Sequence, residues 1–175
     1  MIKITSTNDK YAPIKKIGDS LYLISWNKKP LVTIENDDNG DEIEVMSNEV
    51  STWMQERVRF KPSLEYIRNL IIGWYNEEVD NRILSGFKWN EFPVWLSTEN
   101  QFNYKAAYDL AIQTNGANLP IVFKLGTTEK PVYYTFSSVA ELNDFYLSAI
   151  KYVNDTLAEG WVKKDSIDWE QYKIE

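Results

Sequence analysis

The sequence predicts an α+β protein: an N-terminal β-meander, a bridging helix, and a duplicated β-hairpin–helix (ββαββα) core. Before residue 60, short β-rich runs are separated by turn residues. Between Gly86 and Trp161, the pattern of two strand runs followed by an amphipathic helix occurs twice. We therefore expect two domains, with residues 1–60 forming a β-rich region and residues 61–175 forming an α+β core with a docked C-terminal tail.

The N-terminal region reads as a small meander. Residues 1–18 show little periodicity and are expected to form an extended segment. Strands are predicted at Leu21–Ser25, Leu31–Glu35 and Glu42–Met46, and the last two are joined by a turn at Asn39-Gly40, a strong hairpin signal. The stretch from Ser47 to Phe60 is compatible with a short helix or an irregular linker.

The predicted turn lies within an acidic run that contains no Lys or Arg between Asn36 and Glu49. An EF-hand loop with Gly40 at its sixth position would place Met46 at the twelfth, where a bidentate carboxylate is required. A solvated hairpin tip is therefore favoured over a calcium site. We expect no metal and no cofactor.

The bridging helix is predicted from a start signal and an apolar stripe. Ser63, after Lys61-Pro62, suits an N-cap. The stripe predicts a helix to about Val79. Its members are Leu64, Ile67, Leu70, Ile71, Trp74 and Tyr75.

The first copy of the repeated pattern begins with strands at Phe87–Trp89 and Val94–Leu96. Thr98 and Gln101 form a capping box that opens a helix reaching about Gln113. The inward-facing stripe of this helix is expected to comprise Phe102, Ala106, Ala107, Leu110 and Ala111.

The second copy has alternating apolar residues in Ile121–Leu125 and Val132–Phe136, so both strands can present an apolar face to one side. A capping box, Ser138 with Glu141, opens the longest helix, which is expected to run to about Glu159. Gly160 is interpreted as its C-terminal cap, with Trp161 packing back onto the last turn. The tail is expected to dock through Ile167, Trp169 and Tyr172.

Composition restricts the function classes. The net charge of −7 argues against nucleic-acid binding, which needs a clustered basic face. The absence of Cys and His excludes thiolate chemistry, Ser-His-Asp triads and the usual zinc sites. No apolar run approaches the ~18 residues of a membrane span. Aromatic residues make up 14% of the chain, which is typical of a ring-rich core or of an interface.

Few catalytic patterns remain. The Ser-x-x-Lys matches at Ser25 and Ser148 lack their companion motifs, and no closely spaced glycines could cradle a phosphate. A paired-carboxylate glycosidase stays open, with Asp165 and Asp168 as candidate acids. Binding of a glycan without hydrolysis is the simpler alternative, because stacking on Trp or Tyr needs no titrating pair. We expect no enzymatic activity.

The amino-acid sequence from Leu84 to Tyr172 resembles that of a family of uncharacterised proteins of tailed bacteriophages and prophages of gut bacteria. It is also similar, in its strand-strand-helix order, to a domain of unknown function common in phage tail-fibre regions. The resemblance implies no catalytic residue. It is carried by Leu84–Trp89, Val94–Ser97, Glu99–Ala111, Glu159–Trp161, Lys164–Trp169 and Tyr172.

These observations lead us to expect a non-enzymatic phage structural or assembly protein, an adaptor or accessory component near the tail or head surface. The alternative is a glycan-binding or glycan-cleaving module. The expected partners are other phage structural proteins or a second copy of the chain, without nucleic acid or membrane, in the virion or in the host cytoplasm.

A partner-binding surface is expected where amides on the first repeat helix adjoin tryptophans of its hairpin. A tryptophan anchor gains from burial, and buried amides penalise a wrong partner. The competing interpretation is that the tryptophans belong to the core and the amides brace neighbouring loops. The candidate residues are Trp89, Trp95, Asn100, Asn103 and Lys105.

Overall fold

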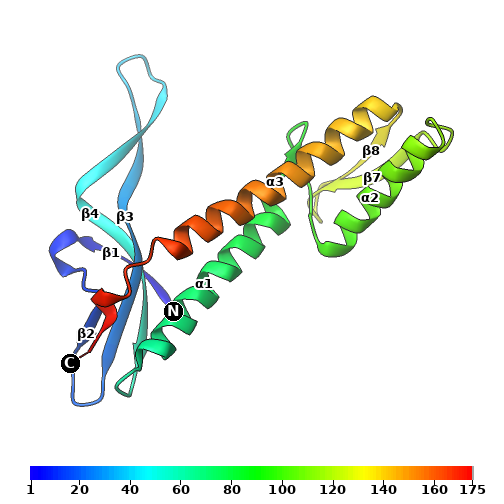
Figure 1. The fold of residues 1–175 in the computed structure, drawn as a ribbon. Coiled ribbons are helices and arrows are strands. Elements are labelled where there is room, and N and C mark those ends of the chain that lie inside the picture. The colour runs from blue at the N-terminus through cyan, green and yellow to red at the C-terminus, as the bar shows by residue number, and fades with distance from the viewer. Residues whose placement is uncertain (175) are drawn as a thin grey trace. The chain divides into compact units, whose positions relative to one another are not determined.

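The computed structural model describes residues 1–174 and shows a mixed α+β fold with three α-helices and an antiparallel sheet of four strands (Figure 1). The predicted α+β class is thereby confirmed. The chain forms two compact units. Unit 1 comprises residues 1–72 and the C-terminal segment that begins at Asp168, and unit 2 comprises Gly73–Ile167. The sequence-based division into residues 1–60 and 61–175 stays a prediction.

Unit 1 is built on a sheet with the strand order β1-β4-β3-β2. Its strands are β1 (Ile2–Thr7), β2 (Ile14–Lys16), β3 (Tyr22–Asn36) and β4 (Glu42–Val58). Residues 1–18, expected to be an extended segment, thus contribute both edge strands. β1 pairs with the second half of β4, and β2 pairs with the first residues of β3.

The β-meander prediction was wrong in its details, because two separately predicted strands form one. β3 continues through register shifts between Trp26 and Lys29 and between Pro30 and Val32. Such bulges absorb residues that fit a ladder poorly without ending it. The stretch from Ser47 to Val58 is strand, not helix or linker. The turn at Asn39-Gly40 is confirmed, with Gly40 at a φ of 87°.

The core of unit 1 lies between the sheet and the first turns of α1 (Leu64–Ser85), a helix longer than predicted. Ile24, Trp26, Ile67 and Ile71 are fully buried or nearly so. The backbone N–H of Tyr66 donates to Ser63 Oγ (3.1 Å), which confirms the predicted N-cap.

The C-terminal tail docks within unit 1, as predicted for two of its aromatic residues. A short 3-10 helix, η2 (Glu170–Tyr172), buries Tyr172, whose hydroxyl donates to the backbone carbonyl of Ser25 (3.0 Å). The guanidinium of Arg68 lies 5.4 Å from the ring centroid of Trp169.

Unit 2 contains two hairpins and most of the helical residues. The first hairpin has strands of two residues each, whereas those of the second have six. This inequality leaves the predicted ββαββα duplication unconfirmed. The elements are β5 (Lys88–Trp89), β6 (Phe92–Pro93), α2 (Thr98–Gln113), β7 (Ile121–Gly126), β8 (Pro131–Phe136) and α3 (Val139–Asp165).

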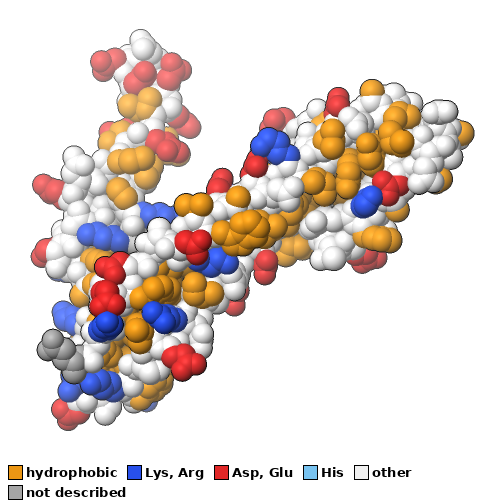
Figure 2. Space-filling model, in the orientation of Figure 1, with side chains coloured by type: hydrophobic (Ala, Val, Ile, Leu, Met, Phe, Trp, Pro, Cys, Tyr) orange, Lys and Arg blue, Asp and Glu red, His pale blue; other side chains and the backbone are white. Residues whose placement is uncertain are grey.

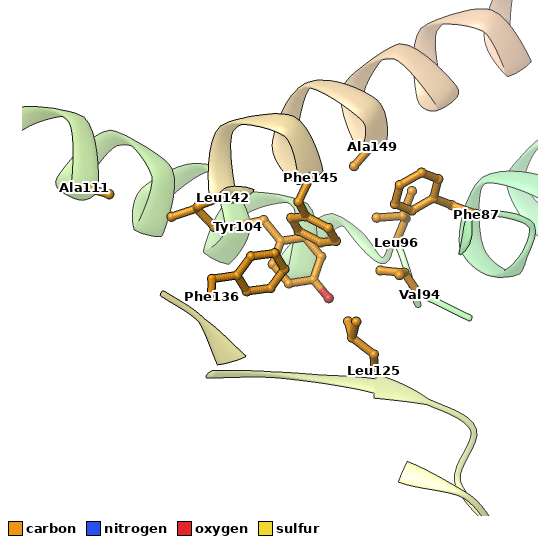
Figure 3. Packing of buried hydrophobic residues seen from close by; sticks show 10 residues of the cluster. All are labelled: Phe87, Val94, Leu96, Tyr104, Ala111, Leu125, Phe136, Leu142, Phe145 and Ala149. Carbon is orange, nitrogen blue, oxygen red and sulfur yellow. The ribbon is translucent and has the colours of Figure 1, made fainter. Parts of the chain in front are cut away.

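Aromatic rings dominate the core of unit 2 (Figure 3). The ring of Phe145 lies 5.0 Å from those of Tyr104 and Phe136 and 5.5 Å from that of Trp89, centroid to centroid. Leu125 of β7 and Phe136 of β8 point into this cluster, so the predicted alternation of the second hairpin is confirmed.

The prediction for α2 was wrong in its cap and in part of its buried stripe, of which Ala107 and Ala111 are buried as predicted. Ser97, not Thr98, is the N-cap, and its Oγ accepts the N–H of Asn100 (3.2 Å). Phe102 is 71% exposed. The face of α2 that carries Tyr104 is the buried one, because the Tyr104 ring packs on the ring of Phe145. The spacing of apolar residues alone did not identify this face. The buried residues of α2 are Tyr104, Ala107 and Ala111.

The predicted end of α3 was also wrong, whereas its start is confirmed. Ser138 Oγ accepts the N–H of Glu141 (3.2 Å). The helix continues past Gly160 to Asp165, and Trp161 is exposed. A Cβ at Gly160 would collide with Cγ2 of Val79 on α1. The glycine therefore serves close helix packing and not helix termination.

Candidate functional site

A groove of about 740 Å³ lies in unit 2 between the start of α2 and strand β7. Five consecutive residues of β7, from Val122 to Gly126, line one side. β7 pairs only with β8, so its other edge has no partner strand in the part of the chain described. The other lining residues are Ser85, Pro93, Val94, Trp95, Asn100, Asn103, Tyr104, Thr127, Thr128 and Glu129.

Side-chain amides hold the α2 side of the groove in place. Asn100 Nδ2 donates to the carbonyl of Trp95 (2.7 Å), and Gln101 Nε2 donates to that of Leu96 (2.7 Å). Together with the Ser97 cap, these bonds tie the first turn of α2 to the loop that carries Trp95. The Trp95 side chain, 54% exposed, is thereby presented beside the groove by an ordered loop.

The floor of the groove is continuous with the core. Tyr104 is buried among the rings and also lines the groove. Figure 3 shows its hydroxyl directed toward the side where Val94 and Leu125 lie. Burial raises the pKa of Tyr104, which further favours the protonated hydroxyl that can donate a hydrogen bond.

The structure brings together three of the five residues proposed from the sequence. Trp95, Asn100 and Asn103 all line the groove. Trp89 packs in the core, with its buried indole N–H unpaired among residues 1–174. Lys105 lies outside the groove and pairs with Asp109 (2.6 Å), whose hydrogen bond raises the lysine pKa. The bracing role of Asn100 agrees with the competing interpretation of the amides.

A second unusual surface lies in unit 1. We define the arm as residues 31–50, the part of the β3–β4 hairpin that, apart from Val50 at its base, extends beyond the pairing with β1 and β2. It leaves large apolar side chains in solvent, with Ile34 67% and Met46 64% exposed and Val32 and Ile43 also exposed. Figure 2 shows apolar side chains along the arm and acidic ones toward its tip.

The register of the arm explains this exposure. Val32 lies opposite Met46, and Ile34 lies opposite Glu44 on the same face. Ile43, opposite Glu35, belongs to the other face. No third strand pairs with either edge between residues 31 and 49, so the ribbon has two exposed faces and two open edges.

A hydrogen-bonded turn closes the arm. Asp37 Oδ1 accepts the backbone N–H groups of Asn39 (2.8 Å) and Asp41 (2.9 Å). These bonds, that from Asp41 foremost, lower the pKa of Asp37. Among residues 1–174, no three His, Cys, Asp or Glu side chains are arranged to hold a metal ion.

Sequence reasoning missed the arm and the β7 side of the groove. The alternation of β7 already placed Val122 and Lys124 on the outward face, so this signal was available. For the arm, the available signal was a run of β-forming residues without another strand to cover it. The candidate acid Asp168 accepts the N–H of Glu170 (3.0 Å), a local role at the start of η2.

No helix among residues 1–174 has the length and apolar character needed to cross a membrane. Comparisons with known proteins find no family model, no curated protein and no solved structure that matches the chain.

Proposed function

We propose that this chain is a non-enzymatic structural or assembly protein of a tailed bacteriophage, an adaptor or accessory component that acts through protein–protein contacts. The arm is the observation that carries the protein-contact part of the proposal. Contiguous exposed apolar surface is uncommon on soluble monomers and marks sites of interaction. Covering it releases about 25 cal/mol for each Å² of apolar area.

The backbone of the arm supports the same proposal. An isolated two-stranded ribbon is marginally stable in water, and open strand edges invite pairing with another chain. The arm combines both features over residues 31–49. A partner that covers one face or adds a strand to one edge would stabilise it.

The phage assignment rests on the resemblance of residues 84–172 to uncharacterised phage proteins. We further propose that unit 2 arose by internal duplication, which the repeated hairpin–helix order of β5 to α3 supports. The site of action would be the virion or, during assembly, the host cytoplasm.

Incorporation into particles tests this function. Wild-type protein and an arm variant, Ile34→Ser with Met46→Ser, are supplied during phage growth, and purified particles and assembly intermediates are analysed by mass spectrometry. We expect the arm variant to be depleted although its melting temperature is unchanged. The matched control is Tyr133→Ser, an exposed position on β8 that lies outside both the groove and the arm. Equal recovery of the arm variant and wild type would overturn the proposal.

The groove is proposed as a second contact, with Trp95 as its anchor. Tryptophan is enriched at interaction hot spots, and the exposed Trp95 lines a groove that Asn100 and Asn103 also line. We expect Trp95→Ala and Asn103→Ala to weaken co-purification with phage components. Lys105→Ala, two positions from Asn103 and outside the groove, should leave it unchanged. If all three variants co-purify equally, the groove is not a contact.

A further inference from the structure

Charge is strongly segregated within unit 1. The arm, residues 31–50, contains seven Asp or Glu and no Lys or Arg. The remainder of unit 1, taken over residues 1–30, 51–72 and 168–174, contains eleven Lys or Arg and six Asp or Glu. The arm is therefore negative and the rest of the unit carries a net positive charge. Figure 2 shows red but no blue side chains toward the tip of the arm.

Four of these cations lie at the end of the sheet remote from the arm. Lys15 and Arg57 both flank Leu23 in the strand register, so they share one face, and Lys16 and Arg59 lie at the same end. All four side chains are exposed. Within residues 1–174, none of the four forms an ion pair with Asp or Glu. We call these four residues the basic end.

An apolar groove of about 550 Å³ opens two residues after Arg59 in the chain. Apolar side chains of Pro62, Leu64 and Ile174 contribute to its lining, and two lysines contribute as well. Its full lining is Lys61, Pro62, Ser63, Leu64, Tyr172, Lys173 and Ile174. The apolar recess and the four cations of the basic end together complement the exposed apolar and acidic residues of the arm.

An arm cannot reach the basic end of its own chain. Lys16 pairs with Tyr22 at the start of β3, whereas the arm tip follows Asn36 at the end of that strand. Fourteen residues of strand at about 3.3 Å each separate the two by roughly 45 Å. The complementary surfaces can therefore meet only between molecules.

We propose that the arm of one copy docks on the basic end of a second copy. Glu42 and Glu44 share a face with Ile34, and they would approach Lys15 and Arg57 while apolar side chains of the arm enter the recess. The inference rests on the proposed function in treating the arm as a contact surface, and it names a second copy as the occupant. Pairing of two arms is disfavoured because each carries seven negative charges.

Such a contact uses different surfaces on the two copies, so a pair joined by one contact still offers one free arm and one free basic end. Repetition gives a ring if the rotation closes and an open filament if it does not. Because exposed charges contribute to the contact, association should weaken as salt shortens the Debye length from ~10 Å at 0.1 M.

Charge exchange tests the proposal. Variant A carries Glu42→Lys with Glu44→Lys, and variant B carries Lys15→Glu with Arg57→Glu. Sedimentation velocity of the full chain is recorded over a concentration series at about 0.05 M and about 0.5 M salt. We expect wild type to self-associate at low salt, and A and B each to show an apparent Kd raised about tenfold or more. Mixing A with B should restore association, since the reversed arm of A then fits the reversed basic end of B.

The control for B is Lys151→Glu with Lys163→Glu on α3, which makes the same change in net charge at exposed positions. This control should associate as wild type does. Association of B alone at wild-type strength would show that arms pair with arms and would overturn the proposal. A monomeric wild type at low salt would overturn it too, as would binding of a short DNA duplex by the basic end without self-association. Depletion of the arm variant from particles could still stand, so the two proposals fail separately.

Discussion

Apolar side chains are buried in the aromatic core of unit 2 but exposed in the arm of unit 1. In unit 2, Phe136 and Phe145 are completely buried between the β7–β8 hairpin and the helices α2 and α3. In the arm, Ile34 and Ile43 alternate with polar residues just as regularly, yet both are exposed. The difference lies in the layer that covers each sheet face, because a face is buried only where another layer packs on it.

Alternation therefore identifies a face that can be buried without showing what buries it. Unit 2 supplies its own covering layer from the following helix, opened by the Ser138 cap directly after β8. The arm is followed by the rest of β4, which pairs with β3 and β1 and leaves both faces of the ribbon open. Such a region must take its covering layer from another molecule or stay exposed.

Removal of a ring from the core of unit 2 should lower the free energy of unfolding more than any other change that we propose. A small effect would contradict the contrast between this core and the exposed arm. We expect Phe145→Ala to lower the free energy of unfolding by about 3–5 kcal/mol, because it leaves a cavity among the surrounding rings. Phe102→Ala, the same change on an exposed side of α2, should stay within about 0.5 kcal/mol. Urea denaturation followed by tryptophan fluorescence measures both. Similar losses in the two variants would mean that the cluster is not the core of unit 2.

Packing between helices of unit 2 offers the next test. Gly160→Ala should destabilise by about 1–3 kcal/mol, because its methyl group meets Val79. Gly73→Ala is the matched control: nothing lies within 4 Å of a Cβ there, and alanine should stabilise the helix by up to about 1 kcal/mol. Thermal unfolding of the two variants should shift in opposite directions. A Gly160→Ala variant more stable than wild type would contradict the role of Gly160 in close helix packing.

The N-caps of α2 and α3 should contribute measurably to the stability of unit 2. Ser97→Ala and Ser138→Ala should each cost about 0.5–2 kcal/mol, since each removes an acceptor for a first-turn N–H group. Thr98→Ala lies one residue inside α2 and should cost less than either. Chemical denaturation of the three variants decides the order. A larger loss for Thr98→Ala would restore the cap expected from the sequence.

The smallest effect belongs to the arm and concerns pH. The carboxylate of Asp37 accepts two backbone hydrogen bonds only in the folded turn, so its folded pKa lies below the ordinary value of 3.8. Its contribution to the turn is complete above that unfolded value and is lost as the pH falls through the folded pKa. NMR titration of the Asn39 and Asp41 amides should show a midpoint below 3.8. A midpoint at or above that value, or no difference from Asp37→Asn, would contradict the turn geometry.

Local signals in the sequence predicted the local features of the fold. The turn at Asn39-Gly40, the caps at Ser63 and Ser138 and the β7–β8 hairpin all depend on a few neighbouring residues. Features set by distant contacts were missed. No strand was predicted over residues 26–30, yet β3 continues through them paired with β4. Only the contact with Val79 explains why Gly160 lies within a helix.

In the candidate site, too, residues that are close in sequence could be predicted and residues that the fold brings together could not. Trp95, Asn100 and Asn103 could be proposed because they lie close together in sequence at the start of α2. Val122 and Lys124 reach the same groove through the fold, from a strand about twenty residues further along. The arm could not be inferred locally, because its exposure depends on where β1 and β2 stop pairing.

The absence of cations from the arm also determines how the chain can be cut. Trypsin cleaves after Lys and Arg, and neither occurs between Lys29 and Arg57. The bond after Lys29 precedes Pro30, which trypsin cleaves poorly. A complete tryptic digest should therefore release the whole arm in one peptide spanning residues 29–57. A glutamate-specific protease, by contrast, has sites along the arm at Glu35, Glu42, Glu44 and Glu49. Comparison of the two enzymes on the native protein would report directly whether the arm is covered.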